Sequence, residues 1–257
     1  TVSNHRMLVP RMPRSASASC THGSTVPSPH SPSASATPAG TSAYHPRLRA
    51  DSITRILAAV SRPVSVVVPV FNGMPHLRDL TDSLLAQTYP DLEIVFSEGG
   101  STDGSPAFLA AITDPRVRVI TPDDAAGAAA NWTAASRAAT GEYVKLVCQD
   151  DLLAPDAIAR QVQDLDAHPS AVMACAQRDI VDANGDVLYP RRGCAGLHDG
   201  LVSGPEVIRR CWLQGTNVIG EPLAVMFRRD AFLDALPWDD RNPLVLDLIF
   251  YARSEEH

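Results

Sequence analysis

The chain has 257 residues, of which 45% are hydrophobic and 20% charged, and its formal net charge is −7. This length suffices for one large domain or two small ones, each with a core that needs no disulfide or metal. The acidic balance argues against a nucleic-acid-binding protein, which would present a basic face. No apolar run approaches the roughly 20 residues of a membrane span, so we expect no transmembrane segment.

The five cysteines are scattered and include no Cys-x-x-Cys pair. This spacing argues against a disulfide framework or a zinc ribbon and favours a reducing compartment. We therefore expect a cytoplasmic protein, and peripheral contact with the inner face of the membrane is left open.

Residues 1–50 differ in composition from the rest of the chain. They contain no Asp or Glu, five Arg, and many Ser, Pro and Ala without apolar periodicity. Such a segment cannot bury enough surface to offset the entropy of ordering, so we predict a disordered extension over 1–50. A targeting leader has a similar composition and is the alternative. The globular domain is then expected over 51–257.

From residue 62 onward, short apolar runs alternate with amphipathic segments. The runs that predict strands lie at 64–70, 92–96, 117–120, 143–148 and 171–176. Helical spacing predicts helices at about 75–88, 108–112, 126–139 and 158–165. The first strand is nearly all apolar, which is typical of a strand buried on both faces. This alternation predicts an α/β fold, a mostly parallel sheet flanked by helices.

Beyond residue 176 the alternation stops, and we expect a smaller, mixed region. Asn184-Gly185 lies between two apolar runs and predicts a two-residue hairpin. Ser203 and Glu206 form a capping-box pattern, which predicts the start of a helix. A further strand is expected at 223–227, so the domain divides into a half at about 62–176 and another at about 177–257.

Ligands of open parallel sheets bind beyond the carboxyl ends of the strands. This rule places the loops at 71–74, 97–105 and 149–154 in one crevice. The second loop contains Glu98-Gly-Gly-Ser-Thr-Asp-Gly-Ser105, whose polar groups can hydrogen-bond a ribose or a base. It lacks the basic residue and spacing of a P-loop, so a nucleoside site is favoured over a phosphate cradle. A simple polar turn is the alternative.

Three aspartates are candidates for chemistry. Asp150 and Asp151 leave a buried strand side by side, and adjacent carboxylates repel each other unless a cation or donors compensate them. Mg²⁺ and Mn²⁺ prefer such oxygen ligands, which makes a metal site one interpretation. In an equally good interpretation, one aspartate caps the following helix and the other is solvated. Asp247 has apolar neighbours on both sides. A carboxylate in such surroundings suits a general base, and a surface position on an amphipathic helix is the alternative.

Three motifs follow one another at Val64–Asn72, at Leu92–Phe96 with Gly100–Gly104, and at Gly141–Asp151. Together they resemble the family 2 glycosyltransferases over about 62–253. The resemblance implies a GT-A fold, in which a Rossmann-like nucleotide-sugar half (about 62–176) joins an acceptor half (about 177–257). It also implies inverting transfer of a sugar, commonly from a UDP-sugar, to a hydroxyl of a glycan or a lipid-linked acceptor, with Mn²⁺ or Mg²⁺ as cofactor. Polysaccharide or glycolipid synthesis in the cell envelope is the pathway expected for such an enzyme.

The resemblance assigns a role to each matching residue. The expected nucleotide contacts are Pro69, Phe71, Asn72, Glu98, Gly100, Ser101, Asp103, Asn131, Gln149 and Asp150. The metal ligands would be Asp150 and Asp151, the catalytic base Asp247, and the acceptor-side residues Gly220, Glu221 and Pro222.

This sequence departs from the family pattern at two positions. Gly99 stands where relatives carry the second aspartate after the second strand, and Cys148 stands where they carry the first aspartate of the metal motif. These departures, with the short segment that follows Asp247, favour one alternative, a non-catalytic nucleotide-binding relic or partner subunit. A nucleotidyltransferase is least favoured, because the loop after the first strand is neither glycine-rich nor basic.

Overall fold

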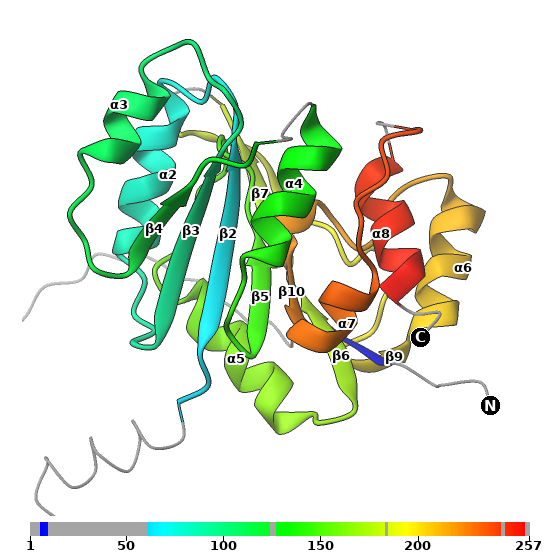
Figure 1. Ribbon diagram of the computed structural model, residues 1–257. Coiled ribbons are helices and arrows are strands. Elements are labelled where there is room, and N and C mark those ends of the chain that lie inside the picture. The colour runs from blue at the N-terminus through cyan, green and yellow to red at the C-terminus, as the bar shows by residue number, and fades with distance from the viewer. Residues whose placement is uncertain (1–5, 10–60, 124–126, 183–184, 243–244, 255–257) are drawn as a thin grey trace, which may run out of the picture. The chain divides into compact units, whose positions relative to one another are not determined.

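A computed structural model describes residues 61–123, 127–182, 185–242 and 245–254, together with the backbone of 6–9 (Figure 1). The elements follow one another as β1 (Arg6–Val9), β2 (Val64–Val70), α2 (His76–Leu85), β3 (Leu92–Glu98), α3 (Ser105–Ala110), β4 (Val117–Ile120), α4 (Ala128–Arg137), β5 (Tyr143–Leu146), α5 (Ala157–Ala167), β6 (Ala171–Cys175), β7 (Arg178–Val181), β8 (Val187–Arg192), β9 (Gly200–Ser203), α6 (Gly204–Gln214), the 3₁₀ turn η1 (Pro222–Ala224), β10 (Val225–Arg228), α7 (Arg229–Asp234) and α8 (Leu246–Ser254). In these ranges none of the helices combines the length and apolar character needed to cross a bilayer.

The main sheet has eight strands in the order β4-β3-β2-β5-β10-β6-β1-β9. Strands β4, β3, β2 and β5 are parallel, whereas β10 runs antiparallel to both of its neighbours, β5 and β6. Strand β1 is parallel to β6 and antiparallel to β9. The mostly parallel α/β sheet predicted from the alternation is therefore confirmed, and β2 lies where the strand order reverses.

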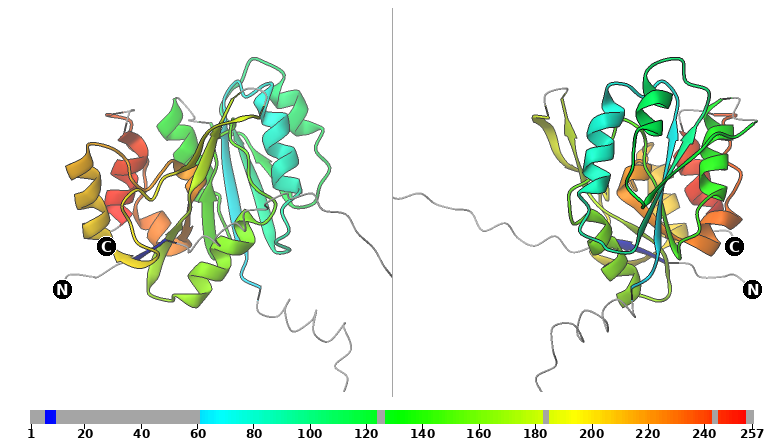
Figure 2. Two further views of the ribbon diagram at one scale, coloured as in Figure 1. Left: turned by 180° about the vertical axis from the view of Figure 1, so that it is seen from behind. Right: turned by 60° about the vertical axis from the view of Figure 1, so that its left-hand side comes forward.

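Helices cover both faces of this sheet, and the central strand β2 contributes to both cores. Val64, Val66 and Val68 pack with residues of α2 and α5, whereas Val67 packs with α4 on the opposite face. Figure 1 and Figure 2 show α2 and α4 on opposite sides of β2. All four valines are fully buried. Burial on both faces explains why this strand is nearly all apolar instead of alternating between apolar and polar residues.

Local predictions met with different outcomes. The predicted hairpin is present as β7–β8, a separate two-stranded antiparallel sheet, but its connection is longer than the two residues expected, since Val181 pairs with Val187. Ser203 is the N-cap of α6, yet its side chain makes no capping hydrogen bond, so the capping box is not formed. Four residues of the segment expected to lack structure, Arg6–Val9, form strand β1, because they pair with β6 and β9. The other residues of 1–50 lie outside the described ranges.

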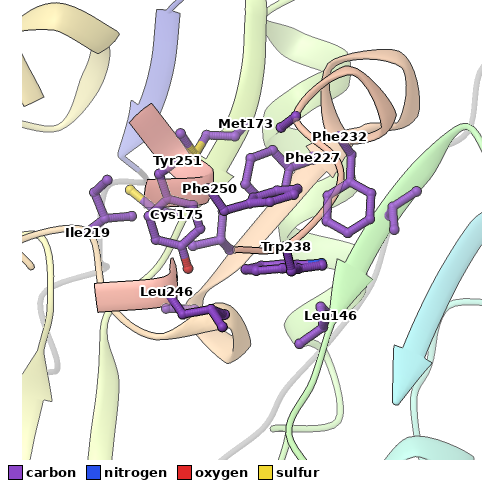
Figure 3. Close-up of a cluster of buried hydrophobic side chains, with 14 of the residues drawn as sticks. Leu146, Met173, Cys175, Ile219, Phe227, Phe232, Trp238, Leu246, Phe250 and Tyr251 are labelled. Carbon is purple, nitrogen blue, oxygen red and sulfur yellow. The ribbon is translucent and has the colours of Figure 1, made fainter. Parts of the chain in front are cut away.

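Helix α8 is attached to the sheet by a cluster of aromatic side chains (Figure 3). The Phe250 ring stacks on Trp238 with centroids 3.8 Å apart and planes 9° apart, and it meets Phe227 of β10 edge-on at 5.8 Å. The Trp238 indole Nε1 donates a hydrogen bond to Ser136 of α4 at 2.9 Å. The cluster thus connects α8 both to β10 and to the helix that covers β2, and it determines where the first turn of α8 lies.

Candidate active site

The loops that follow β2 and β3 are joined by hydrogen bonds between side chains and backbone. The Asn72 backbone N–H donates to Ser101 Oγ at 2.9 Å, and the Thr102 backbone N–H donates to the side-chain oxygen Asn72 Oδ1 at 2.8 Å. The Met74 nitrogen donates to Asp103 Oδ2 at 3.0 Å. These contacts fix both loops at the carboxyl edge of the sheet, so Asn72, Ser101 and Asp103 lie together as expected.

Glu98, at the end of β3, turns its carboxylate toward its own loop. Its two oxygens accept the backbone N–H groups of Gly100 at 3.1 Å and Ser101 at 2.6 Å. Burial would raise the pKa of Glu98, but the hydrogen bonds from Ser101 and Gly100 outweigh it, so the pKa lies below its ordinary value. Glu98 is therefore an ionised group that organises the loop, and Gly100 contributes its backbone N–H at a φ of +85°.

Gln149 connects the loop after β5 to the residue that follows β2. The Phe71 nitrogen donates to Gln149 Oε1 at 2.8 Å, and Gln149 Nε2 donates to the Phe71 carbonyl at 2.9 Å. This pair holds the Phe71 backbone while its ring stays 58% exposed. Pro69, two residues earlier, is buried in β2 opposite Ser97 of β3.

Asn131 of α4 lies beneath the loop after β3 instead of facing the crevice. Ser97 Oγ donates to Asn131 Oδ1 at 2.7 Å, and Asn131 Nδ2 donates to the Val70 carbonyl at 3.1 Å. The residue is only 4% exposed, so the direct nucleotide contact expected of it is replaced by a supporting role. A Cβ atom at Gly99 would lie 2.6 Å from Asn131 Nδ2, which explains why glycine fits at this position.

The two carboxylates after β5 differ in their surroundings. Asp150 is exposed, whereas Asp151 is half-buried and accepts the Cys148 N–H at 3.3 Å. Burial, and then the charge of Asp150, raises the pKa of Asp151 to about 6. In the described ranges, no group of three or more His, Cys, Asp or Glu is arranged to hold a metal ion. The chain itself thus offers two adjacent carboxylates for a cation.

Asp247 lies in the first turn of α8. Its Oδ2 accepts a hydrogen bond from Asn217 Nδ2 at 2.7 Å, and its Oδ1 accepts the Leu248 N–H at 2.7 Å. The pKa of Asp247 lies above its ordinary value. Burial and the charge of Glu221 raise it by more than the two hydrogen bonds lower it. This half-buried carboxylate has the surroundings that the general-base hypothesis requires.

The charges of four acids act on one side chain, that of Cys148. Burial, and then the charges of Asp151, Asp150, Asp247 and Glu221, raises the pKa of the Cys148 thiol far above its ordinary value. The thiol is therefore neutral at physiological pH.

The segment Gly220–Pro222 closes the site on the side of the second half. Gly220 has a φ of +117°, and its carbonyl accepts hydrogen bonds from Asn217 Nδ2 at 2.9 Å and from Tyr251 Oη at 3.2 Å. Glu221 forms an ion pair with Arg178 of β7. The expected acceptor-side residues thus lie next to Asp247, with Glu221 exposed and Pro222 buried.

Two residues of this region, Lys145 and Asn217, were not anticipated from the sequence. Lys145 of β5 is the one lysine of the chain, yet it is only 1% exposed. Its Nζ donates to Gln161 Oε1 at 2.8 Å, to the Val225 carbonyl at 3.2 Å and to the Leu223 carbonyl. A lone lysine inside an otherwise apolar strand was a usable signal, as was the Asn-x-x-Gly spacing of Asn217 and Gly220, which is typical of an Asx turn.

A separate cavity of about 450 Å³ lies between α4 and the segment Pro237–Asp240. Its lining includes Arg137 and Trp238 but none of the residues expected to bind nucleotide, metal or acceptor. The chemistry-bearing side chains converge at the strand ends and not in this cavity, so we place the candidate site at the strand ends.

Comparisons with known proteins agree with this arrangement. The glycosyltransferase GlyG of Streptococcus pneumoniae is 36% identical over 115 residues, which are 42% of this chain and 38% of GlyG. The succinoglycan biosynthesis protein ExoO of Rhizobium meliloti is 34% identical over 122 residues, 48% of this chain and 35% of ExoO. The chain thus spans less than two fifths of either relative.

Among solved structures, S. aureus TarS 1–349 superposes with a TM-score of 0.58 at 18% identity, over 75% of this chain and 55% of that structure. This likeness shows that the fold is of the GT-A type. Residues 65–235 match the family described as Glycosyl transferase family 2, which is well over half of the sequence. The chain therefore belongs to glycosyl transferase family 2.

Proposed function

We propose that this protein transfers a sugar from a nucleoside-diphosphate sugar to an acceptor hydroxyl with inversion at the anomeric carbon. The observation that carries the proposal is the hydrogen-bonded junction of the loops after β2, β3 and β5, in which Gln149 precedes Asp150 and Asp151. Asp150 and Asp151 supply a pair of cation ligands there, and Asp247 of α8 is the half-buried base candidate. Family membership makes sugar transfer the reaction that this pairing serves best.

The donor would lie across the joined loops. The exposed Phe71 ring offers a stacking surface for the nucleobase, and the loop after β3 presents hydroxyl and amide groups to the ribose. We take UDP as the first nucleotide to test. S. aureus TarS, which shares the fold at 19% identity and a TM-score of 0.52, has been crystallised with UDP-GlcNAc.

The residues after β5 fit a divalent cation. Asp150 and Asp151 supply oxygen ligands, and Mn²⁺ or Mg²⁺ commonly combines one or two carboxylates with phosphate oxygens and water. Repulsion between the two carboxylates, seen in the raised pKa of Asp151, would be relieved by such a cation. When bound, the cation neutralises charge that develops on the leaving diphosphate.

In the proposed reaction, Asp247 takes the proton from the acceptor hydroxyl as its oxygen attacks the anomeric carbon. The bond from that carbon to the diphosphate breaks, and the nucleoside diphosphate leaves from the opposite face. The acceptor enters beside Gly220–Pro222, and we propose a glycan or a lipid-linked sugar, in line with the name of ExoO. The scattered cysteines favour a reducing compartment for this reaction.

Calorimetric titration of UDP into the full chain, with Mn²⁺ and then with EDTA, tests the donor site. We expect binding that depends on Mn²⁺ and that weakens at least about tenfold in Asp150→Ala, because a charge-assisted ligand is lost. Asp230→Ala, whose side chain is 94% exposed on α7, is the matched control and should bind as the wild type does. Folded protein that binds no UDP in either condition would reject a UDP site.

One observation favours a second candidate, a nucleotide-binding protein without turnover. Cys148 stands at the first position of the expected metal motif, and burial keeps its thiol neutral, so this residue adds no anionic ligand to Asp150 and Asp151. Asp247→Asn separates the two candidates. For a transferase we expect retained UDP binding and a transfer rate lower by about 100-fold or more. A wild type that binds UDP and transfers none of a panel of sugars would support the second candidate.

A further inference from the structure

We propose that Asn217 is the positioning residue of the catalytic base: its side-chain amide orients the Asp247 carboxylate and favours its ionised form. This inference rests on the function proposed for Asp247 and goes beyond it. Asn217 lies in the segment between α6 and η1, 30 residues from Asp247 in sequence.

The orientation of the Asn217 amide follows from its backbone partners. Its Oδ1 faces the N–H groups of Ile219 at 3.0 Å and Gly220 at 3.1 Å, and two donors require an acceptor at that position. The other end of the amide is therefore the NH₂ group. Its two hydrogens are taken by the Gly220 carbonyl at 2.9 Å and by Asp247 Oδ2 at 2.7 Å.

All four hydrogen-bonding positions of this amide are thus occupied. Rotation of the side chain by 180° would place the NH₂ group against two N–H donors and the oxygen against a carboxylate. The amide can present only a donor to Asp247, and a donor stabilises a carboxylate over the neutral acid. With Leu248 N–H on the other oxygen, the plane of the Asp247 carboxylate is held from both sides.

The charged surroundings of Asp247 make this donor important. The charge of Glu221, from the segment before η1, raises the pKa of Asp247. Cys148 after β5, Cys211 of α6 and Tyr251 of α8 also face it, and burial raises the pKa of all three, which keeps them neutral. Burial and Glu221 favour a protonated, inactive Asp247, and Asn217 counteracts both.

Asn217→Asp tests the inference with little change in shape. The new carboxylate keeps an acceptor for the N–H groups of Ile219 and Gly220, but it replaces the donor to Asp247 with a second negative charge. We expect the acid limb of the pH profile of kcat to move upward by about one pH unit or more, as happens when two carboxylates share a site. KM for the donor should stay within about twofold of the wild type, because donor contacts are untouched.

The matched control is Gln163→Glu, which adds the same charge at an exposed position of α5. It should leave the pH profile of the wild type unchanged. Asn217→Ala, a second variant, removes the donor without adding charge, and we expect a shift in the same direction but smaller. An equal loss of rate at every pH in both Asn217 variants would overturn the proposal, because that result indicates a structural role alone.

A readout independent of turnover separates this inference from the proposed function. With aspartate labelled at the carboxyl carbon, the resonance of Asp247 is identified by its loss in Asp247→Asn, and its titration is followed by NMR. A higher apparent pKa in Asn217→Asp than in Gln163→Glu supports the coupling. An unchanged titration overturns it. A normal coupling in a protein that transfers no sugar would instead overturn the role of Asp247 as a base.

Discussion

Gly99 illustrates how one residue adapts the site to its neighbours. The space beside this glycine is filled by Asn131, whose Nδ2 would lie 2.6 Å from a Cβ at Gly99. Asn131 in turn holds Ser97 and the Val70 carbonyl at the ends of β3 and β2. Glycine at one position and a buried asparagine at the other therefore form a matched pair.

We expect Gly99→Ala to lower the free energy of unfolding by about 1–3 kcal/mol, because the methyl group overlaps a packed side chain. The cost should be smaller in an Asn131→Ala background, where that side chain is absent. Urea unfolding of the two single variants and the double variant measures this coupling. Gly104→Ala is the control, since its Cβ would meet only Met74 Cγ at 3.8 Å. Additive effects of Gly99→Ala and Asn131→Ala would contradict the matched-pair interpretation.

At the scale of elements, Lys145 connects β5 to η1, β10 and α5. Its ammonium group has acceptors in Gln161, Leu223 and Val225, so a buried cation is compensated by dipoles and not by a contacting carboxylate. Gln161 Nε2 also donates to the Ala224 carbonyl at 2.9 Å. These bonds hold η1, and with it the segment that carries Glu221, against the strand that ends at the two aspartates.

Burial lowers the pKa of Lys145 from 10.5 to about 7. The unfolded chain then holds more protons than the folded one between these two values, so the free energy of unfolding should rise as pH increases from about 7 to 10. Lys145→Met should abolish this contribution. It should also cost about 2–4 kcal/mol at pH 7, because buried carbonyls lose their donor.

Urea unfolding of the wild type and Lys145→Met across this pH range checks the sign. Because the chain contains a single lysine, ¹³Cε-lysine labelling gives one resonance that reports the titration directly. A wild-type stability that falls relative to Lys145→Met with rising pH, or a resonance that titrates near 10.5, would contradict this account of the buried lysine.

At the scale of the whole domain, one sheet and one aromatic cluster join the two halves. Strand β10 from the second half inserts between β5 and β6 of the first. Phe250 of α8 stacks on Trp238, and Trp238 is bonded to Ser136 of α4. The helix that carries Asp247, the proposed base, is thereby packed against the sheet whose strand ends carry the proposed donor site.

Phe250→Ala should lower the free energy of unfolding by about 3–5 kcal/mol, because it removes a fully buried ring from the cluster. Because the sheet is shared, we expect one cooperative transition at a lower midpoint, and UDP binding to be kept below that midpoint. Calorimetric unfolding measures this. Trp212→Ala is the aromatic control, since Trp212 is 81% exposed on α6. Two separate transitions in Phe250→Ala would indicate that the halves unfold independently.

The predictions that held from sequence concern neighbours along the chain. Periodicity and turn residues that lie close together in sequence predicted the valine-rich strand β2, the hairpin around residue 185 and the loops that follow the strands. Those signals are local. They predicted the alternation of strands and helices, from which the parallel sheet follows, and they predicted that Asp150 and Asp151 come directly after a strand. They also predicted a capping hydrogen bond at Ser203, which is absent because residues that suit a cap need not form one.

Only the tertiary structure determined which distant groups meet. Asn217 and Asp247 are 30 residues apart, Ser97 and Asn131 are 34 apart, and Lys145 reaches Val225 across 80 residues. Each contact depends on how helices pack on the sheet, which the pattern of a single segment does not specify. The sequence by itself therefore determined the parallel strands from β2 to β6, their loops and the positions of the acids in this member of glycosyl transferase family 2, but not the edge strands β1 and β9. Packing decided which of those groups face the crevice and which support it, because burial and hydrogen-bond partners are properties of the folded whole.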